Sequence, residues 1–433
     1  MGDLALNIAA SGLDAQQAAM DTISENLTNA NTPGYVSESV QLATNPGGDL
    51  LGVGDGVRTV AVTQNSDQLL ATNAQQSQGL LSQSTALQQI LQGAQAVFPE
   101  PSSSGIAADL SSFWQSWDAI AQNLVSDFQQ AATQLGNLQS NAQSQVSTSV
   151  SQANTMLSQV AALNVQIAAS QGAGTPPNSL LDQQNQILGQ LASSIGAVGV
   201  LQPNGTTDVE LNGITLVQGS WSDTIKVTGG AGDMALVARA SGATIPASSG
   251  SVAGELAAIN QYLPAYQSQL DATANDLAQT VNTQLAAGYT ATGASGSAYP
   301  LFTGTGAAGL SVNPTIVSNP QLIAASDTGT LPDATNDGAN AQAMAELYNV
   351  ASGPDNQYQS LIEGLGSQVQ AVNNQVQSQT SVANTAQANL QAIEGVNTND
   401  QMVQMLTYQQ AYQASAKLIS TVDTMMQALI QAA

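Results

Sequence analysis

The C-terminal stretch MVQMLTYQQAYQASAKLISTVDTMMQALIQAA, Met402–Ala433, decides the fold of this chain. Apolar and aromatic side chains recur in it at alternating steps of three and four residues. The positions are Met405, Tyr408, Tyr412, Ser415, Ile419, Val422, Met426 and Leu429. Only Ser415 is polar, so the spacing is that of a heptad seam, by which a helix buries one narrow stripe against another helix. The stretch contains no Pro or Gly that would interrupt the helix.

A matching seam lies near the other end of the chain. Its positions are Leu6, Ala9, Leu13, Gln16, Met20, Ile23 and Leu27. Only Gln16 is polar. We therefore predict two terminal helices of roughly 25–30 residues, each about 40 Å long, that pair as a coiled coil and carry no second apolar face. Two ordinary amphipathic helices packed on a larger domain are the plainer alternative.

Composition limits the partners that this chain can have. Its 433 residues are enough for two or three domains. They include 29 Asp and Glu but only four Lys and Arg, which gives a net charge of −25 at pH 7. Binding of nucleic acid requires clustered basic residues, and an anionic membrane surface would repel this charge. We therefore expect neither nucleic acid nor a membrane among the partners.

The acidity comes from a shortage of bases, since charged residues make up only 8% of the chain. One hypothesis is an acidic external medium. Below about pH 4 most carboxylates are protonated, and the four bases would then dominate the net charge. The alternative is a lineage that favours Gln and Ser without any such selection. Aggregation at pH 3–4 in a solubility titration would count against the hypothesis.

The sequence contains no Cys and no His. Disulfides, thiol catalysis, His-based triads and the usual zinc sites are therefore excluded. No pair of carboxylates lies in a recognisable pocket-forming motif, so we expect no catalytic, cofactor-binding or metal-binding residues. The N-terminal region lacks the basic and apolar segments of a cleaved signal peptide, and no run of 18 apolar residues occurs.

The middle of the chain predicts a mainly helical protein with a small β insertion. Long polar segments with one apolar stripe are typical of bundles or rods. We expect helices over residues 69–98, 106–123, 128–170, 179–195, 254–289, 340–349 and 357–394. We predict extended backbone over residues 36–63, with a Gly-rich turn at Gly47–Gly56. Residues 315–317 are predicted to form a short extended piece. In 196–250, alternating runs flank Asn212–Gly213, a strong hairpin signal.

A sharp turn follows the N-terminal seam. The sequence NANTPGY, Asn29–Tyr35, places Pro33 and Gly34 at the two central positions of a type II turn. Pro fixes the first of these positions and Gly supplies the positive φ that the second requires. We expect the first helix to end near Asn29.

The stretch SGLDAQQAAMDTISENLTNANTPGY, Ser11–Tyr35, resembles the N-terminal signature of the axial proteins of the bacterial flagellum, which are the rod, hook and hook-associated proteins. Four further stretches resemble the hook-associated protein 1 family, the hook–filament junction proteins. These are Val150–Leu188, Gly254–Ala258 with Val281–Tyr289, Pro300–Gly304 and Tyr408–Met425. Gln184 and Asn185 depart from the family, which usually has charged residues there.

The resemblance implies a structural subunit rather than an enzyme. Such a subunit is exported unfolded by the flagellar type III route, without a cleaved signal peptide, and lies outside the cell. Its implied partners are further copies of itself in a ring-like layer, the hook protein, a second junction protein leading to the filament, and an export chaperone. The alternatives are another flagellar axial protein and, least favoured, a secreted cell-wall enzyme.

The expected organisation is discontinuous. Residues 1–45 and 397–433 would form the terminal coiled coil, residues 46–195 and 251–396 a mainly helical domain, and residues 196–250 an outward-facing β domain. The expected assembly interface comprises Leu6, Leu13, Met20, Ile23, Leu27, Met405, Tyr408, Tyr412, Ile419, Val422, Met426 and Leu429, with Pro33 and Gly34 forming the turn.

Overall fold

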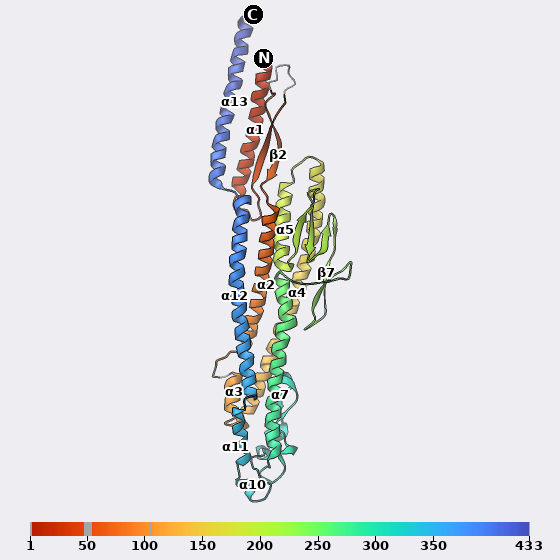
Figure 1. Cartoon of the computed structure of the whole chain (residues 1–433), viewed down its shortest axis with the longest axis vertical. Coiled ribbons are helices and arrows are strands. Elements are labelled where there is room, and N and C mark those ends of the chain that lie inside the picture. Colours follow the sequence, from red (N-terminus) through yellow and green to blue (C-terminus); the bar gives the residue numbers. More distant parts are fainter. Residues whose placement is uncertain (1, 47–53, 104, 433) are drawn as a thin grey trace.

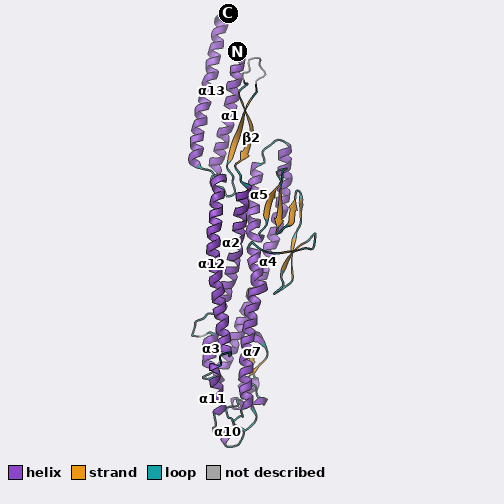
Figure 2. Cartoon of the chain, viewed as in Figure 1, coloured by secondary structure: helices purple, strands orange, loops and turns teal. Residues whose placement is uncertain are grey.

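The chain folds into a long rod with both termini at the same end (Figure 1). The computed structural model describes residues 2–46, 54–103 and 105–432. The terminal helices α1 (Gly2–Asn29) and α13 (Thr398–Ala432) lie side by side and antiparallel at one end of the rod. Helices dominate the remainder, and the strands lie to one side of them (Figure 2). The predicted fold class, mainly helical with small inserted sheets and paired ends, is confirmed.

Long and short helices and several small sheets make up the rest of the rod. The helices between the terminal pair are α2 (Gln68–Val97), α3 (Ile106–Phe113), α4 (Trp117–Gly172), α5 (Asn178–Ile195), α6 (Ser251–Ala257), α7 (Leu263–Ala287), α8 (Gly306–Gly309), α9 (Pro314–Ser318), α10 (Asp333–Asn336), α11 (Ala339–Glu346) and α12 (Pro354–Glu394). The strands are β1 (Glu38–Thr44), β2 (Val57–Gln64), β3 (Val198–Leu201), β4 (Thr207–Leu211), β5 (Ile214–Gln218), β6 (Trp221–Ser222), β7 (Ile225–Thr228), β8 (Ala235–Ala238), β9 (Thr244–Ile245), β10 (Phe302–Thr303) and β11 (Ser311–Val312). The predicted turn at Gly47–Gly56 lies largely outside the described residues.

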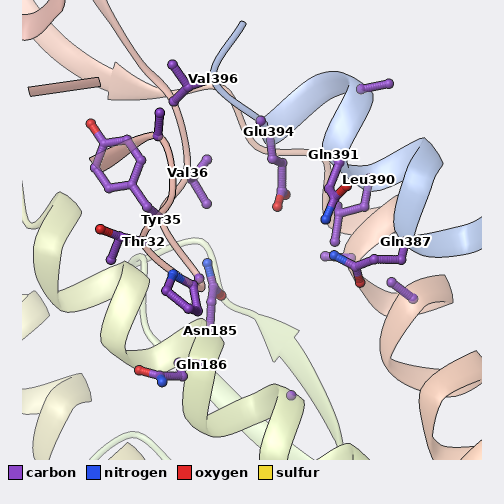
Figure 3. A pocket seen from close by; sticks show the side chains of 18 of the residues that line it. Thr32, Tyr35, Val36, Asn185, Gln186, Gln387, Leu390, Gln391, Glu394 and Val396 are labelled. Carbon is purple, nitrogen blue, oxygen red and sulfur yellow. The ribbon is translucent and has the colours of Figure 1, made fainter. Parts of the chain in front are cut away.

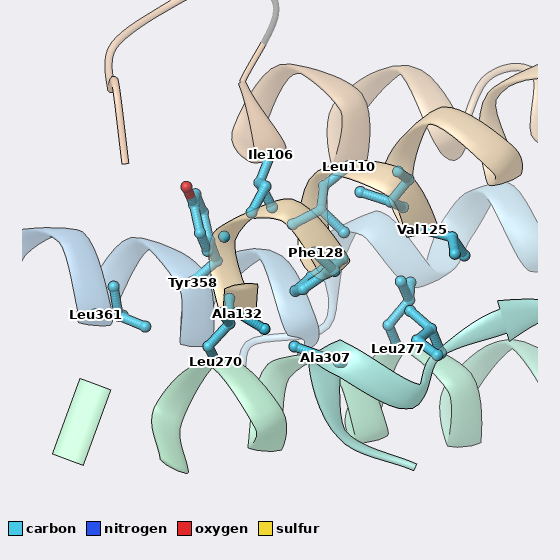
Figure 4. Packing of buried hydrophobic residues seen from close by; sticks show 14 of the residues in the cluster. Ile106, Leu110, Val125, Phe128, Ala132, Leu270, Leu277, Ala307, Tyr358 and Leu361 are labelled. Atoms are coloured by element: carbon cyan, nitrogen blue, oxygen red, sulfur yellow. The ribbon is translucent and has the colours of Figure 1, made fainter. Parts of the chain in front are cut away.

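One hydrophobic core fills the far end of the rod, where α3, α4, α7 and α12 meet (Figure 4). Its aromatic rings meet edge to face: the centroids of Phe98 and Tyr358 are 6.2 Å apart, and those of Phe113 and Trp114 are 5.3 Å apart. Such arrangements match the positive ring edge to the negative ring face. Few aromatics are present in the chain, and this core collects several of them.

The predicted helix over residues 106–123 is wrong. Helix α3 ends at Phe113, and α4 begins at Trp117 and runs without interruption to Gly172. The break allows both Phe113 and Trp114 to be buried, and the Trp114 indole Nε1 donates a hydrogen bond to the Asp355 carboxylate at 2.8 Å. A buried indole needs such an acceptor, and the acceptor comes from a helix more than 200 residues away in sequence.

The expected extended piece over residues 315–317 is also wrong, because it is the short helix α9. Asn313 caps it by accepting a hydrogen bond from the Thr315 N–H at 3.0 Å, and Pro314 occupies the first helical turn. Both residues are helix-start signals. The capping signal therefore outweighed the β-branched residues that favoured a strand.

The inserted strands form two small antiparallel sheets that pack against helices. They form a sheet of order β3-β4-β5-β6 and a second of order β7-β8-β9. The hairpin at Asn212–Gly213 is present, with φ values of 49° and 79° that fit a type I′ turn. Val209, Leu216 and Leu236 share one core with α4, α5 and α6.

Asparagine side chains on helices hold these and other strands in place. In each case one side-chain amide both donates to the carbonyl and accepts from the N–H of a single residue, as a neighbouring strand would. The five pairs are Asn26 with Glu38, Asn154 with Ile225, Asn164 with Thr207, Asn260 with Met234 and Asn282 with Phe302, at 2.7–3.1 Å. We call these pairs amide clasps. An amide satisfies both backbone groups without introducing charge, which fits a chain so poor in charged residues.

Candidate assembly site

Helices α1 and α13 pack antiparallel over most of their length (Figure 1). Gln16 Nε2 donates a hydrogen bond to Ser415 Oγ at 3.3 Å, so the one polar residue of each predicted seam meets the other. Gly12 lies at the same level, where an added Cβ would come within 3.4 Å of Ser415 Oγ. Small residues thus allow the two helices to approach closely.

The buried face of α1 is lined mostly by small residues. Ala9, Ala15, Ala19 and Ile23 are at most 4% exposed. Alanine at the contact brings two helix axes closer than leucine would. A pair packed in this way buries little apolar area, so it gains little stability from burial alone.

The predicted interface residues take different positions on this pair. Ile23 and Val422 are buried, and Leu13, Met20, Met405, Tyr408 and Ile419 are half-buried. Leu6, Leu27, Tyr412 and Met426 are exposed, at 36–41%. The side chain of Leu429 lies outside the described residues. The single chain therefore buries only part of the predicted set.

Helix α13 carries further apolar residues that pack in no core. Met402, Val403, Leu406, Leu418 and Met425 are 46–64% exposed there. These positions lie outside the heptad seam. A search for the heptad spacing alone therefore leaves them out. Their spacing, with Leu418 and Met425 seven residues apart and Val403 and Leu406 three apart, is the sequence signal that could have revealed them.

Asn26 connects the terminal pair to the turn that follows it. Its side chain is fully buried and forms an amide clasp with Glu38 at the start of β1. Asn26 Oδ1 also accepts from the Tyr35 hydroxyl at 2.9 Å, and Asn26 Nδ2 donates to Gln401 Oε1 on α13 at 3.1 Å. One amide thus joins α1, the turn, β1 and α13. Asn26 lies within the signature stretch Ser11–Tyr35, but nothing in its local sequence predicts this role.

The chain reverses at the predicted turn. The Tyr35 N–H donates to the Thr32 carbonyl at 3.2 Å, and Gly34 has a φ of +83°. Pro33 and Gly34 are both exposed. The turn borders a cavity of about 750 Å³ that is also lined by α2, α5 and the end of α12 (Figure 3). Polar amides such as Gln75, Asn185 and Gln391 make up much of its lining.

Asp182 and Glu394 connect the segment after the turn to the body beside this cavity, Asp182 through its carboxylate and Glu394 through its backbone carbonyl. Asp182 on α5 accepts from the Val36 N–H at 3.2 Å and from Gln64 Nε2 at 2.7 Å. Glu394, at the end of α12, accepts from the Asp67 N–H at 3.3 Å through its side chain and from the Ser37 N–H at 2.8 Å through its carbonyl. We call this region, with Glu38, the joint.

The joint shifts the acid–base behaviour of its carboxyl groups. Burial raises the pKa of Asp182 to about 6, and the charge of Glu38 adds to the rise while the hydrogen bonds from Val36 and Gln64 oppose it. Burial also raises the pKa of Glu38 and of Glu394. No cationic group is among the causes of these shifts, so the negative charge remains uncompensated.

The described residues give no sign of a metal centre or a membrane span. No group of three or more Asp and Glu side chains in that part of the chain is arranged to hold a metal ion. Within the same ranges, none of the helices combines the length and apolar character needed to cross a bilayer.

Comparisons with known proteins match both the ends and the middle of the chain. The model of the flagellar hook-associated protein FlgK helical domain matches residues 119–302. The model of the flagella basal body rod protein matches residues 6–35, and that of the C-terminal region of the flagellar basal body rod proteins FlgEFG matches residues 391–432. The last two matches coincide with the two terminal helices.

Relatives and a solved structure extend this similarity to nearly the whole chain. Flagellar hook-associated protein 1 of Bacillus subtilis is 26% identical over 99% of this chain and 97% of its own length. That of Salmonella typhimurium is 24% identical over 98% of this chain and 99% of its own length. The flagellar hook junction protein FlgK from Burkholderia pseudomallei has a similar fold, with a TM-score of 0.62 and 17% identity over 76% of this chain and all of that one. Over nearly its whole length the chain is similar to flagellar hook-associated protein 1 of two bacteria, and its helical body matches the model of the FlgK helical domain.

Proposed function

We propose that this chain is a structural subunit of the bacterial flagellum and forms a layer at the junction between hook and filament. Two curated relatives named as flagellar hook-associated protein 1 align with it over almost their full lengths. A rod whose two ends pair at one tip has the shape of a subunit that contributes one element to a central tube. The relatives are structural proteins, and the function proposed here requires no catalysis.

One observation carries the proposal of assembly through the terminal helices. Helix α13 exposes Val403, Leu406 and Met425 on a face that its partner α1 does not cover. Exposed apolar residues in such a row mark a surface for protein contact. The exposed seam residues Leu6 and Met426 add a second apolar strip. A neighbouring copy of the pair supplies the apolar cover that the single chain lacks.

The proposed partners follow from the position of this layer between hook and filament. Further copies of the chain lie beside each subunit, the hook protein lies on one side of the layer, and a second junction protein leading to the filament lies on the other. An export chaperone holds the subunit before it leaves the cell by the flagellar route. Nucleic acid and membranes are not partners in this proposal.

We also retain the division of the chain as part of the proposal. Residues 1–45 and 397–433 form the inner tube, residues 46–195 and 251–396 the helical wall, and residues 196–250 face outward. The modest apolar contact between α1 and α13 suits a helix pair that becomes ordered as neighbours assemble.

Substitutions on the uncovered face of α13 test this function. Cells whose only copy is Val403→Gln/Leu406→Gln should build hooks but shed filament subunits into the medium. Ala416→Gln/Asp423→Gln is the matched control, since both residues are exposed on α13 roughly opposite Val403 and Met425. Circular dichroism should show that each variant remains folded. Filaments of normal length on cells with the first variant would refute assembly through this face, and removal of residues 402–433 should reproduce the loss.

A further inference from the structure

The joint differs chemically from the contacts that hold the body together. In the body, strands are docked by amide clasps such as Asn154 with Ile225 and Asn164 with Thr207. Amides do not titrate. At the joint, the Val36 N–H of the segment that follows α1 donates to the carboxylate of Asp182 on α5. The Glu394 carboxylate accepts from the Asp67 N–H, which links α12 to α2 on the body side of the joint. The strength of the joint therefore depends on Asp182, a group that can gain a proton.

The charged groups that act on these two carboxylates are acidic. The charge of Glu38 on β1 acts on Asp182, and the charges of Asp67 and Asp182 act on Glu394. Glu25 on α1 acts in turn on Glu38. Glu394 also stands in the last turn of α12, where the helix dipole disfavours a negative charge.

The nearest basic residues on the elements that meet here lie far along those elements. On the β1–β2 ribbon, Arg58 pairs with Ala43 while Glu38 pairs with Gln64, so Arg58 is about 17 Å from the joint at about 3.4 Å per residue. On α13, Lys417 follows Gln401 by 16 positions, or roughly 24 Å.

We propose that the joint between the terminal helix pair and the body is a pH-sensitive connection, closed in mild acid and loosened at neutral pH and above. Protonation of Asp182 removes a half-buried charge, while its carbonyl oxygen can still accept from Val36 and Gln64. When the joint opens, the Asp182 carboxylate regains water, so its charged form favours opening.

The pH dependence of joint closure follows from the direction of these pKa shifts. The pKa of Asp182 rises from an ordinary value near 4 to about 6 in the closed joint. Closure is therefore fully favoured below pH 4 and loses this contribution as the pH rises through 6. Because the group is partly exposed, we discount the full shift and expect the closing equilibrium to change roughly tenfold from Asp182 alone. Glu38 and Glu394 act in the same direction.

Such a joint gives the single chain two states that are set by the medium. At neutral pH the terminal pair swings against the body, and in an acidic medium the rod stiffens. The inference concerns the isolated subunit, so it does not depend on the proposed flagellar role. It also gives a structural basis to the hypothesis of an acidic external medium.

Distance measurements across the joint test the proposal directly. The chain has no Cys, so two can be introduced at exposed positions, Ser378→Cys on α12 and Gln409→Cys on α13. Nitroxide labels at both sites report the separation by double electron–electron resonance. We expect one narrow distance distribution at pH 4.5, a broad one at pH 8, and a midpoint near pH 6.

Two variants distinguish the effect of the carboxylates at the joint from that of other acidic residues. Asp182→Asn/Glu394→Gln, in the labelled background, should keep the distribution narrow at both pH values. Asp127→Asn is the matched control, because burial also raises the pKa of Asp127 to about 6 but this residue lies on α4 near the far core. The control should retain the pH dependence of the parent.

Three outcomes would overturn the proposal: an identical distribution at pH 4.5 and pH 8, an unchanged pH dependence in the double variant, or loss of the dependence in Asp127→Asn. Should the double variant fail to fold, amide hydrogen exchange in the unmodified chain gives an independent readout. After correction for the intrinsic rate, the Val36 and Ser37 N–H groups should be at least several-fold better protected at pH 4.5 than at pH 8, and equal protection would refute closure in acid.

Discussion

Gln16 on α1 and Ser415 on α13 face each other at 3.3 Å, although 399 residues separate them in sequence. They are the single polar members of two otherwise apolar seams. The Gln16 side-chain oxygen, Oε1, is buried and has no hydrogen-bond partner among the residues that the structure describes. A polar pair within an apolar seam fixes the register of two helices at a cost in stability. The terminal pair is therefore aligned by this contact more than it is stabilised by it.

Replacement of this polar pair should make the terminal helices more stable. In Gln16→Leu/Ser415→Ala the unpaired buried oxygen disappears and apolar contact is gained without added bulk beside Gly12, which we expect to be worth about 1 kcal/mol. Hydrogen exchange over α1 should slow by a few-fold. Gln17→Leu, at an exposed position on the same helix, should leave exchange unchanged. Faster exchange in the double variant would show that the polar contact itself stabilises the pair.

Replacement of the asparagine in an amide clasp by aspartate should destabilise the protein. Asn164 is 1% exposed, and its Nδ2 donates to the carbonyls of Thr207 and Gly219, both at 2.9 Å. In Asn164→Asp the donors are lost and a charge is buried, which should cost about 2–4 kcal/mol of unfolding free energy at pH 7.

Urea unfolding measures this loss. Asn374→Asp on the exposed side of α12 serves as the control and should change stability by less than about 0.5 kcal/mol. In the Asn164→Asp variant the introduced carboxyl group can donate again once it is protonated, so the penalty should shrink as the pH falls towards 4. A penalty that is independent of pH would contradict the role assigned to the amide donors.

Glu255 should make the body less stable at high pH. Its side chain on α6 is 6% exposed, and its Oε2 atom is buried with no hydrogen-bond partner in the described part of the chain. Burial raises the pKa of Glu255 to about 7, from an ordinary value of 4.5. The raised pKa means that the protonated form favours folding: this contribution is complete below pH 4.5 and is lost as the pH rises through 7.

Glu255→Gln mimics the protonated form and should therefore stabilise the chain by roughly 2 kcal/mol at pH 8, with little effect at pH 4.5. Thermal or urea unfolding at the two pH values provides the measurement. Glu346→Gln, at an exposed position, is the control and should show no such difference. A variant that is less stable than the parent at pH 8 would show that the Glu255 charge has a stabilising partner.

Gly254 allows α6 to pack against the backbone of α2. A Cβ at this position would lie 2.1 Å from the Gln83 carbonyl oxygen and 2.9 Å from the Leu87 nitrogen. Backbone atoms cannot move aside as a flexible side chain can, so Gly254→Ala should cost about 2–4 kcal/mol. Gly364→Ala on α12 meets nothing within 4 Å and should gain up to about 1 kcal/mol from helix propensity. Similar stabilities for the two variants in urea would contradict the close packing of α6 on α2.

Local features of this chain followed from the sequence because they depend on near neighbours. The heptad spacing at each end predicted α1 and α13, the Pro33–Gly34 pair predicted the reversal, and Asn212–Gly213 predicted a hairpin that the structure contains. Charge depletion excluded a nucleic-acid interface on physical grounds. The matched signature at the ends also predicted the family.

The tertiary structure decided what depends on distant partners. Helix α3 ends before Trp114, whose indole donates a hydrogen bond to Asp355. Helix propensity over residues 106–123 depends on local sequence alone, so it cannot predict an acceptor on a distant helix. Asn26 and Asn164 look like ordinary polar residues until the fold presents them with a backbone N–H and carbonyl. The same is true of Asp182 and Glu394, which come from α5 and α12 and acquire their raised pKa only when folding buries them beside the turn. Periodicity along a chain determines which elements form, whereas burial and pairing across hundreds of residues determine the chemistry of the groups that those elements carry.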